Sequence, residues 1–378
     1  MTVSITAVEA IPVSVPVETA YETSLSVESD ERATFDHVIV RVETDSGVTG
    51  VGEIAPEPYW PHGLTQSSCA TLVDETIAPV LEGRPLHRIR RHVDRMEREL
   101  AGEPFPLYGV DVALHDALGR VRDLPVYELL GGPAGGEPTI DLHYSIGIKP
   151  PDELVAEARE AAEAGFTAFK IKVGGPEFEA ERAAIAALGE RVPEAAVRVD
   201  ANQGWTPPEA MRRIPILDEA ADGLVLVEQP VAHDDLDGLA RVAAAVDVPI
   251  LADEACFSPR DVAALARRDA CDVVNIKLGK TGGLARACDV ATVAAAHGFP
   301  CFVGSMLELG VGAAANAQFA AASPPVSYPT GTLNVHAEHG LVVERDRWEP
   351  DGSTFELPDA PGLGVTVDES ALARYRVD

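Results

Sequence analysis

The chain has 378 residues, 46% of them hydrophobic, and its 61 acidic against 30 basic residues give a net charge of −31. That charge excludes a nucleic-acid-binding protein, because phosphate groups need cationic partners, and no run of 18 apolar residues indicates a membrane span. The N-terminal residues show no signal-peptide pattern, and five scattered cysteines without a C-x-x-C pair predict neither a disulfide framework nor a zinc site. We therefore expect a globular cytoplasmic protein without a nucleic-acid or membrane partner.

The first 55 residues alternate apolar and polar side chains, as antiparallel strands do. The expected strands are 5–15, 37–43 and 48–53, with a turn at Asp45-Ser-Gly47. A small antiparallel sheet therefore opens the chain.

Two loops flank these strands, a polar one at 16–34 and a Pro-rich one at 53–61 that carries Tyr59 and Trp60. By composition alone, both are solvated loops. Residues 65–131 then show helical periodicity, and the Pro- and Gly-rich run that follows predicts a domain boundary.

From residue 139 onward, short apolar strands alternate with Ala-rich amphipathic helices. The expected strands are 140–146, 168–173, 197–200, 224–228, 250–253, 273–277 and 300–303. Seven or eight such units in succession predict parallel βαβ units closed into a (β/α) barrel. The alternative, an open doubly wound sheet, normally has a Gly-rich phosphate loop after an early strand, and this sequence has none.

Three of these strands end on a carboxylate: Asp200, Glu228 and Asp253. They lie one βα repeat apart, so they should converge at the C-terminal mouth of the barrel, where barrel active sites lie. Three carboxylates in a dry pocket need a counter-ion, and an all-oxygen set suits Mg²⁺ before Mn²⁺. The alternative is that each carboxylate caps the helix after it.

Only five of the 30 basic residues are lysines: Lys149, Lys170, Lys172, Lys277 and Lys280. Lys170 and Lys172 share one face of a strand, so each ammonium should lower the pKa of the other and make a base available near pH 7. The alternative is an edge strand protected by its lysines. Lys277 ends a strand on the other side of the carboxylates, so lysines should face each other across the pocket.

These motifs resemble the enolase superfamily, and within it the muconate-lactonizing subgroup of the mandelate racemase/muconate lactonizing enzyme family. The resemblance rests on Lys170-x-Lys172, Asp200-x-Asn202, Glu228-Gln-Pro230, Asp253-Glu254, Asn275-Ile-Lys277-x-x-Lys-Thr-Gly-Gly283 and Gly304-Ser-Met-Leu-Glu308. It implies an α/β fold: an α+β capping domain at 1–125, a (β/α)7β modified TIM barrel at 126–340, and a C-terminal segment at 341–378 that returns to the capping domain.

The same resemblance implies the site. Lys172 and Lys277 are the expected bases, with Lys170 beside Lys172, and Asp200, Glu228 and Asp253 are the expected Mg²⁺ ligands. Expected substrate contacts or supporting residues are Asn202, Glu254, Glu308, Ser145, Tyr59 and Trp60. In this family the loops near 16–34 and 53–61 close over the pocket.

The implied activity is a Mg²⁺-dependent isomerase that abstracts a proton α to the carboxylate of a small substrate. A muconate-type cycloisomerase comes first, because Glu308 matches its motif. N-acylamino-acid racemase, o-succinylbenzoate synthase and dipeptide epimerase are alternatives, although the stretch Tyr328–Asn334 lacks the Asp-x-Asp by which dipeptide epimerases bind an amino group. A non-catalytic metal-binding scaffold is the alternative from another class, and a homo-oligomer is expected.

The net charge of −31 generates a prediction about salt. Self-repulsion destabilises a compact acidic chain in dilute buffer, whereas at about 1 M salt the Debye length falls to about 3 Å and the repulsion is screened. The melting temperature should therefore rise with KCl or NaCl into the molar range, as in a halophilic cytoplasm. A melting temperature that stays flat or falls over that range contradicts a halophilic origin.

Overall fold

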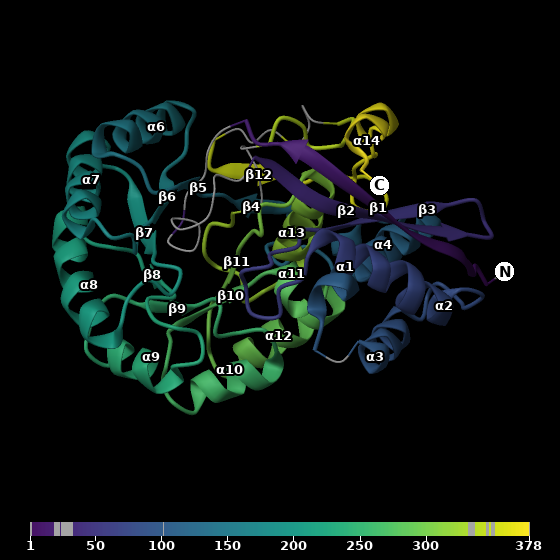
Figure 1. Cartoon of the computed structure of the whole chain (residues 1–378), viewed down its shortest axis with the longest axis horizontal. Coiled ribbons are helices and arrows are strands. Elements are labelled where there is room, and N and C mark those ends of the chain that lie inside the picture. Colours follow the sequence, from purple (N-terminus) through teal and green to yellow (C-terminus); the bar gives the residue numbers. More distant parts are fainter. Residues whose placement is uncertain are drawn as a thin grey trace.

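The computed structural model describes residues 2–18, 23, 33–100, 102–331, 337–344, 348 and 352–377. Figure 1 shows an antiparallel sheet with neighbouring helices beside a larger arrangement of strands and helices. Most of the 16–34 loop, and the end of the Tyr328–Asn334 stretch, lie outside the described residues.

The N-terminal sheet contains β1 (Ile5–Pro16), β2 (Thr34–Thr44) and β3 (Thr49–Ile54) in the order β1-β2-β3. Both pairings are antiparallel, as the alternating pattern predicts. Helices follow in the order α1 (Gln66–Thr71), the π-helical η1 (Leu72–Ile77), α2 (Ala78–Leu81), α3 (Ile89–Glu99), α4 (Pro104–Arg122) and α5 (Val126–Leu129).

Helix α4 lies between the sheet and the rest of the molecule, which explains why it is buried on almost every side. It approaches β3 closely because both elements have glycine at the contact. A Cβ atom on Gly52 would lie 1.9 Å from the carbonyl oxygen of Gly109, so no larger residue fits there. The close approach lets β3 reach past α4 toward the barrel.

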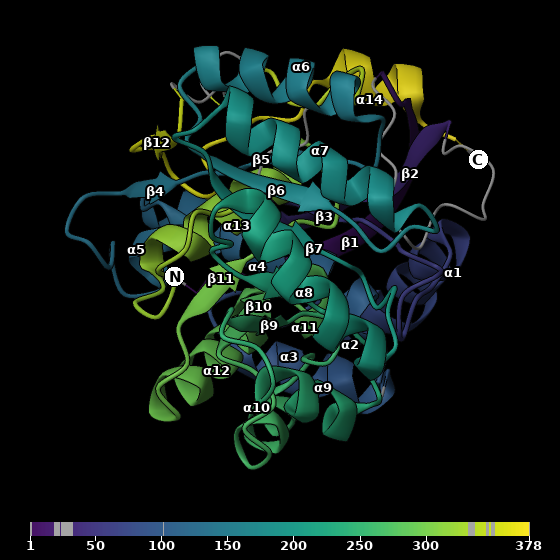
Figure 2. The ribbon, with the colours of Figure 1, turned by 90° about the vertical axis from the view of Figure 1, so that its left-hand side faces the viewer.

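The second sheet is parallel and has the order β11-β10-β9-β8-β7-β6-β5. Its strands are β5 (Tyr144–Ile146), β6 (Ala168–Lys172), β7 (Ala196–Asp200), β8 (Val227–Glu228), β9 (Ile250–Ala252), β10 (Val273–Ile276) and β11 (Cys301–Val303). The helices between and after them are α6 (Pro151–Glu163), α7 (Phe178–Arg191), α8 (Pro207–Ala221), α9 (Leu236–Ala243), α10 (Pro259–Ala266), α11 (Leu278–Thr281), α12 (Leu284–Ala296) and α13 (Gly310–Ala322). Figure 2 shows α6, α7 and α8 covering the outer face of this sheet.

The segment from Pro325 to Gly331 closes the sheet. On one side Cys301 N donates to Pro325 O at 2.7 Å, and Gly331 N donates to Val303 O at 3.1 Å. On the other side His143 N donates to Thr330 O at 3.0 Å. The segment thus occupies the eighth strand position, and the expected (β/α)7β barrel is confirmed.

One predicted strand was wrong. Residues 140–146 do not form a single strand, because β4 (Thr139–Asp141) pairs antiparallel with β12 (Thr354–Glu356) before the chain turns into β5. Both halves are apolar and alternating, so the pattern could not show that they belong to different sheets.

The C-terminal helix α14 (Glu369–Tyr375) packs against β1. Val377 N donates to Pro12 O at 3.0 Å, and Arg41 on β2 pairs with Glu369 at 2.6 Å. The end of the chain therefore contacts the N-terminal sheet, while the domain boundaries near residues 125 and 340 stay predictions.

A buried carboxylate joins the N-terminal sheet to the barrel. Glu53 on β3 accepts hydrogen bonds from Leu309 N at 2.6 Å and Gly312 N at 2.7 Å, at the start of α13. His37 Nδ1 lies 2.8 Å from the same carboxylate, and both side chains are buried. Glu53 therefore caps a helix of the barrel from outside it, where the helix dipole favours a negative charge.

We predict that Glu53→Gln lowers the free energy of unfolding by about 1–3 kcal/mol, because an amide cannot accept from His37 and two backbone N–H groups as a carboxylate does. Chemical denaturation at neutral pH measures the change. Glu43→Gln is the matched control, since Glu43 is exposed on β2 and should change stability by less than about 0.5 kcal/mol. Equal effects of the two substitutions would contradict a capping role for Glu53.

Candidate active site

Strand register brings the predicted residues to one level at the C-terminal end of the barrel. Lys172 on β6 pairs with Asp200 on β7, and Asp200 pairs with Glu228 on β8. Glu228 pairs in turn with Leu251 on β9, so Asp253, two residues further on, projects from the same face. The three carboxylates therefore stand on neighbouring strands, as expected.

Two lysines lie at one end of this carboxylate row. Lys172 Nζ lies 2.6 Å from Asp200 Oδ2 and 2.6 Å from Asn202 Oδ1. Lys170 Nζ lies 3.4 Å from Asp200 Oδ2 and 3.5 Å from Glu228 Oε2. Both lysines are buried, so the carboxylates offset the repulsion between the two ammonium groups.

Lys277 and Lys280 lie at the other end of the row. Lys277 Nζ is 2.7 Å from Asp253 Oδ2, and Lys280 Nζ is 2.7 Å from Asp253 Oδ1 and 2.6 Å from the Asp253 carbonyl oxygen. Lysines thus bracket the row from both sides, as the sequence predicts.

Amide side chains fix the carboxylates. Asn275 Nδ2 donates to Glu228 Oε1 at 2.7 Å, and Asn202 Nδ2 donates to Glu254 Oε1 at 2.9 Å. Asp253 N donates to Gln229 Oε1 at 2.9 Å, which sets the start of the loop after β9. The carboxylates of Glu228 and Glu254 are therefore each held by an amide that lies two strands away in the sheet order.

The backbone beside these residues is strained. Asn202 has φ 38° and Gln229 has φ 32°, both in the left-handed region that favours glycine. Such positions occur at functional sites because the surrounding structure holds a side chain in a required direction. Here the two strained residues are those whose amides support Glu254 and the backbone of Asp253.

Burial and neighbouring charges separate the pKa values within the row. Burial raises the pKa of Asp200, but Lys172 and Lys170 outweigh it and lower that pKa overall. Burial and the charge of Asp200 raise the pKa of Glu228. The row therefore holds carboxylates of unequal basicity within one buried cluster.

The pKa values at the other end of the row are displaced as well. Burial and the charges of Asp253 and Asp200 raise the pKa of Glu254 to about 8. Burial lowers the pKa of Lys277, whereas Asp253 and Glu228 raise it more strongly. In this arrangement Lys277 is an ammonium ion, and Glu254 is a buried acid that can hold a proton.

Three other predicted contacts have different surroundings. Lys277 Nζ lies 4.1 Å from the centre of the Trp60 ring, a cation–π contact that brings the 53–61 loop to the lysines. Tyr59, by contrast, is 70% exposed, so the loop presents Trp60 rather than Tyr59 to the site. Ser145 on β5 stands beside Lys170 in the strand register.

Glu308 lies in the loop before α13 and is fully buried. Its Oε2 accepts from Ser305 Oγ at 2.6 Å and from Met306 N at 2.8 Å, while its Oε1 accepts no hydrogen bond from the described residues. Burial raises the pKa of Glu308. The side chain is thus a buried carboxyl group with one oxygen available.

The chemistry of the donors fits a hard divalent cation. Asp200, Glu228 and Asp253 offer only oxygen atoms, and Glu228 Oε2 is buried without a hydrogen bond from any described residue. As the side chains stand, no three His, Cys, Asp or Glu side chains in the described ranges are placed to hold an ion. Lysine ammonium groups neutralise Asp200 and Asp253 instead. A bound metal ion would take over from these lysines the neutralisation of the two carboxylates.

Sequence reasoning missed two buried cations. Lys280 appears in the motif that contains Lys277 but received no role. The signal was that lysine is scarce in this chain, with only five residues, so each lysine needs an explanation. Arg198 lies two residues before Asp200 on β7, where its guanidinium is 4.2 Å from the Phe302 ring and donates to Pro329 O at 2.8 Å. It also contacts His143 Nδ1, so it links β7 to the strand positions on both sides of the barrel closure. A charged residue between two valines of a buried strand was the available signal.

Comparison with known proteins decides the family. A model of the mandelate racemase / muconate lactonizing enzyme N-terminal domain matches residues 5–131, and an enolase C-terminal domain-like model matches residues 153–371. The chain belongs to the mandelate racemase/muconate lactonizing enzyme family of the enolase superfamily. The predicted resemblance is confirmed.

Relatives in this family carry several activities. The chain is 35% identical to an L-Ala-D/L-Glu epimerase of Bacillus subtilis over 94% of each chain. It is also 35% identical to a muconate cycloisomerase of Rhodococcus opacus, over 89% of this chain and 90% of the relative. The curated relatives are isomerases, so the expectation of an isomerase is confirmed, and the substrate is left open.

Solved structures give the same picture. An N-succinyl Arg/Lys racemase of Bacillus cereus matches with a TM-score of 0.92 and 28% identity over 99% of this chain and 98% of that one. A dipeptide epimerase of Enterococcus faecalis, complexed with Mg and a dipeptide, matches with a TM-score of 0.88 and 30% identity. The match covers 96% of this chain and 99% of that one. Within the described residues, no helix is long and apolar enough to cross a bilayer.

Proposed function

We propose that this protein is a Mg²⁺-dependent cycloisomerase that interconverts a muconate-type diacid and its lactone. In that reaction a carboxylate oxygen adds to the conjugated double bond, and a proton is delivered to the carbon α to the other carboxylate. The reverse direction removes the same α-proton. The observation that carries the reaction class is the pair of lysines, Lys172 and Lys277, at opposite ends of one buried carboxylate row.

The residues of this chain divide the work by position. A substrate carbon above the row lies between the two lysines, so one amine can exchange its α-proton while the other stabilises developing negative charge as an ammonium. Asn202 and Asp200 orient Lys172 through contacts of 2.6 Å each. Trp60 covers Lys277 and excludes water from that side of the pocket.

Asp200, Glu228 and Asp253 would hold the metal ion. When bound, Mg²⁺ polarises the substrate carboxylate and makes the proton on the adjacent carbon easier to remove. The rest of the site keeps these ligands in place: Asn275 holds Glu228, and Lys280 holds Asp253.

Glu308 supports a cycloisomerase over an epimerase. It resembles the glutamate of muconate cycloisomerases, and it is a buried carboxyl group with one available oxygen. The sequence Tyr328–Asn334 contains no acidic residue to bind a substrate ammonium group. A diacid therefore suits this chain better than a dipeptide.

Racemisation of an N-acyl amino acid is the second candidate. The observation that favours it is the symmetry of the two lysine clusters, each with a lysine against a terminal carboxylate of the row. A racemase needs a proton carrier on each face of the substrate, whereas a cycloisomerase needs one.

We predict that Asp200→Asn weakens divalent-cation binding and activity together, because it removes a charged ligand. Titration with Mn²⁺, followed by electron paramagnetic resonance, measures binding without any substrate. Asp234→Asn, in the exposed loop after β8, is the control and should bind as the wild type does. Unchanged Mn²⁺ affinity in Asp200→Asn would exclude this carboxylate as a ligand.

We further predict that Lys172→Ala and Lys277→Ala each reduce turnover by about 10²-fold or more, the usual contribution of a positioned acid or base. If the protein is a racemase, each of these two variants should still exchange the α-proton of one substrate enantiomer with D₂O. If it is a cycloisomerase, the variants should not show this pattern. Lys149→Ala is the matched control, because Lys149 pairs with Glu157 away from the row. Near wild-type turnover in either active-site variant would disprove the two-lysine mechanism.

A screen of the wild-type protein against a library of carboxylic acids tests whether it is an enzyme at all. If no α-proton exchanges with D₂O for any acid in the library, the protein is a non-catalytic metal-binding scaffold.

A further inference from the structure

The barrel contains a buried histidine that the proposed reaction does not use. His143 immediately precedes β5, and its side chain is buried against Arg198 of β7. Arg198 lies two residues before Asp200, so it projects from the same face of β7, one layer below the carboxylate row. The imidazole therefore lies inside the barrel, beneath the reacting groups.

Gly331 marks the space that this imidazole fills. A Cβ atom on Gly331 would lie 2.4 Å from His143 Cε1 and 2.8 Å from His143 Nε2, which is closer than van der Waals contact allows. The ring thus occupies the place that a side chain at position 331 would take.

Gly331 stands at the level of the pocket. It is the last residue of the segment in the eighth strand position, and its N donates to Val303 O at 3.1 Å. Gly304 follows Val303, and a Cβ atom there would lie 2.7 Å from Lys277 Cε. Two neighbouring wall positions thus lack a side chain, because Lys277 fills the space at one and His143 fills the space at the other.

The imidazole is held from two sides. Arg198 Nη2 donates to His143 Nδ1 and, at 2.8 Å, to Pro329 O. The centre of the Phe302 ring lies 5.5 Å from the centre of the imidazole and 4.2 Å from the Arg198 guanidinium. Because the guanidinium keeps its proton, His143 Nδ1 is the acceptor and the ring carries its own proton on Nε2.

The ring is uncharged at neutral pH. Burial lowers the pKa of His143 well below its ordinary value, and the positive charges of Arg198 and Lys170 lower it further. Replacing this side chain with an apolar one therefore changes the volume of the barrel interior and leaves its charge unchanged.

The position of the ring matters for a bound substrate. The carboxylate row and its lysines occupy the wall from β6 to the end of β10. The far end of a substrate held at the row can therefore lie only against the remaining wall, which consists of β11, the eighth strand position and β5. His143 stands in that remaining wall.

We propose that His143 is a specificity-determining residue, whose imidazole closes the pocket on the eighth-strand side and restricts the enzyme to short diacids. The proposal rests on the proposed function, in which the substrate is a diacid held by one end at the carboxylate row. The ring then sets how far the other end can extend.

Loss of the imidazole should lengthen the pocket. His143→Ala should bind octanedioate about tenfold more tightly than the wild type does, the gain expected from burying two more methylene groups. Hexanedioate should bind to both proteins about equally. Isothermal titration calorimetry with each diacid in the presence of Mg²⁺ measures the affinities without turnover, because saturated diacids cannot cyclise.

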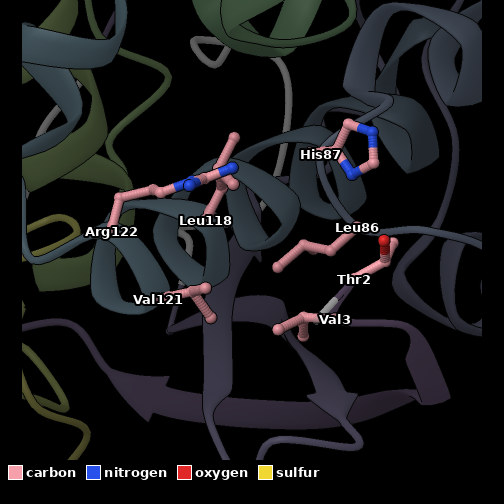
Figure 3. A pocket seen from close by; sticks show the side chains of 7 residues that line it. All are labelled: Thr2, Val3, Leu86, His87, Leu118, Val121 and Arg122. Carbon is pink, nitrogen blue, oxygen red and sulfur yellow. The ribbon is translucent and has the colours of Figure 1, made fainter.

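His87→Ala is the matched control. Figure 3 shows His87 at a hollow of about 180 Å³ that residues of the N-terminal part line, outside the barrel. Its loss should leave both affinities unchanged. His143→Asn serves if His143→Ala does not fold, because the amide oxygen can still accept from Arg198 while most of the ring is removed, and it should shift the preference in the same direction.

A second set of variants tests the placement of the ring without any ligand. Gly331→Ala brings a Cβ atom against the imidazole, so it should lower the melting temperature of the wild type and have little effect in the His143→Ala background. Thermal unfolding of the four proteins measures the difference. An equal loss in both backgrounds would show that the ring does not fill this space and would overturn the proposal.

The binding results separate this proposal from the proposed function. If the wild type binds hexanedioate and His143→Ala gains no affinity for octanedioate, this proposal alone is overturned. An equal loss of affinity for both diacids in His143→Ala gives the ring a purely structural role and also overturns it. If the wild type and all variants bind neither diacid, the diacid of the proposed function is wrong, and the limit on its length is overturned with it.

Discussion

The structure depends on one buried row of three carboxylates with lysines at both ends. Asp200, Glu228 and Asp253 could not be buried together as carboxylates, nor could Lys170, Lys172 and Lys277 as ammonium ions, because either set alone would carry a large desolvation penalty. Placed on adjacent parallel strands, each set makes the other tolerable. The barrel supplies the strand register that makes this possible, because its parallel strands end at one level and bring these side chains together.

Much of this was available from the sequence. A carboxylate at the end of a parallel strand must lie at the C-terminal edge of the sheet, because all parallel strands end at that edge. The regular repeat of strand and helix predicted the barrel, and the repeat of carboxylates at strand ends predicted the row. The family motifs added Asn202, Glu254 and Glu308 as neighbours, and the structure buries all three. Local patterns succeed here because the strands are short, apolar and evenly repeated.

Other features depend on contacts between distant segments and could not be read locally. Residues 139–146 belong to two sheets because β12, far along the chain, captures their first half. Lys280 and Arg198 are buried cations whose partners lie on other strands, so their sequence context gave only an unusual residue without a role. Tyr59 and Trp60 are adjacent and chemically alike, and only the path of the loop distinguishes the exposed ring from the one over Lys277.

The carboxylate at the end of β3 has a consequence for how the pocket can change. Because Glu53 is fixed to the start of α13, the chain leaves the sheet from an anchored point, and the Pro-rich loop that carries Trp60 begins at the next residues. Variation in that loop is thereby insulated from the docking of the two parts of the molecule. Residues of the loop beyond Glu53 can therefore change without removing the hydrogen bonds that join β3 to α13.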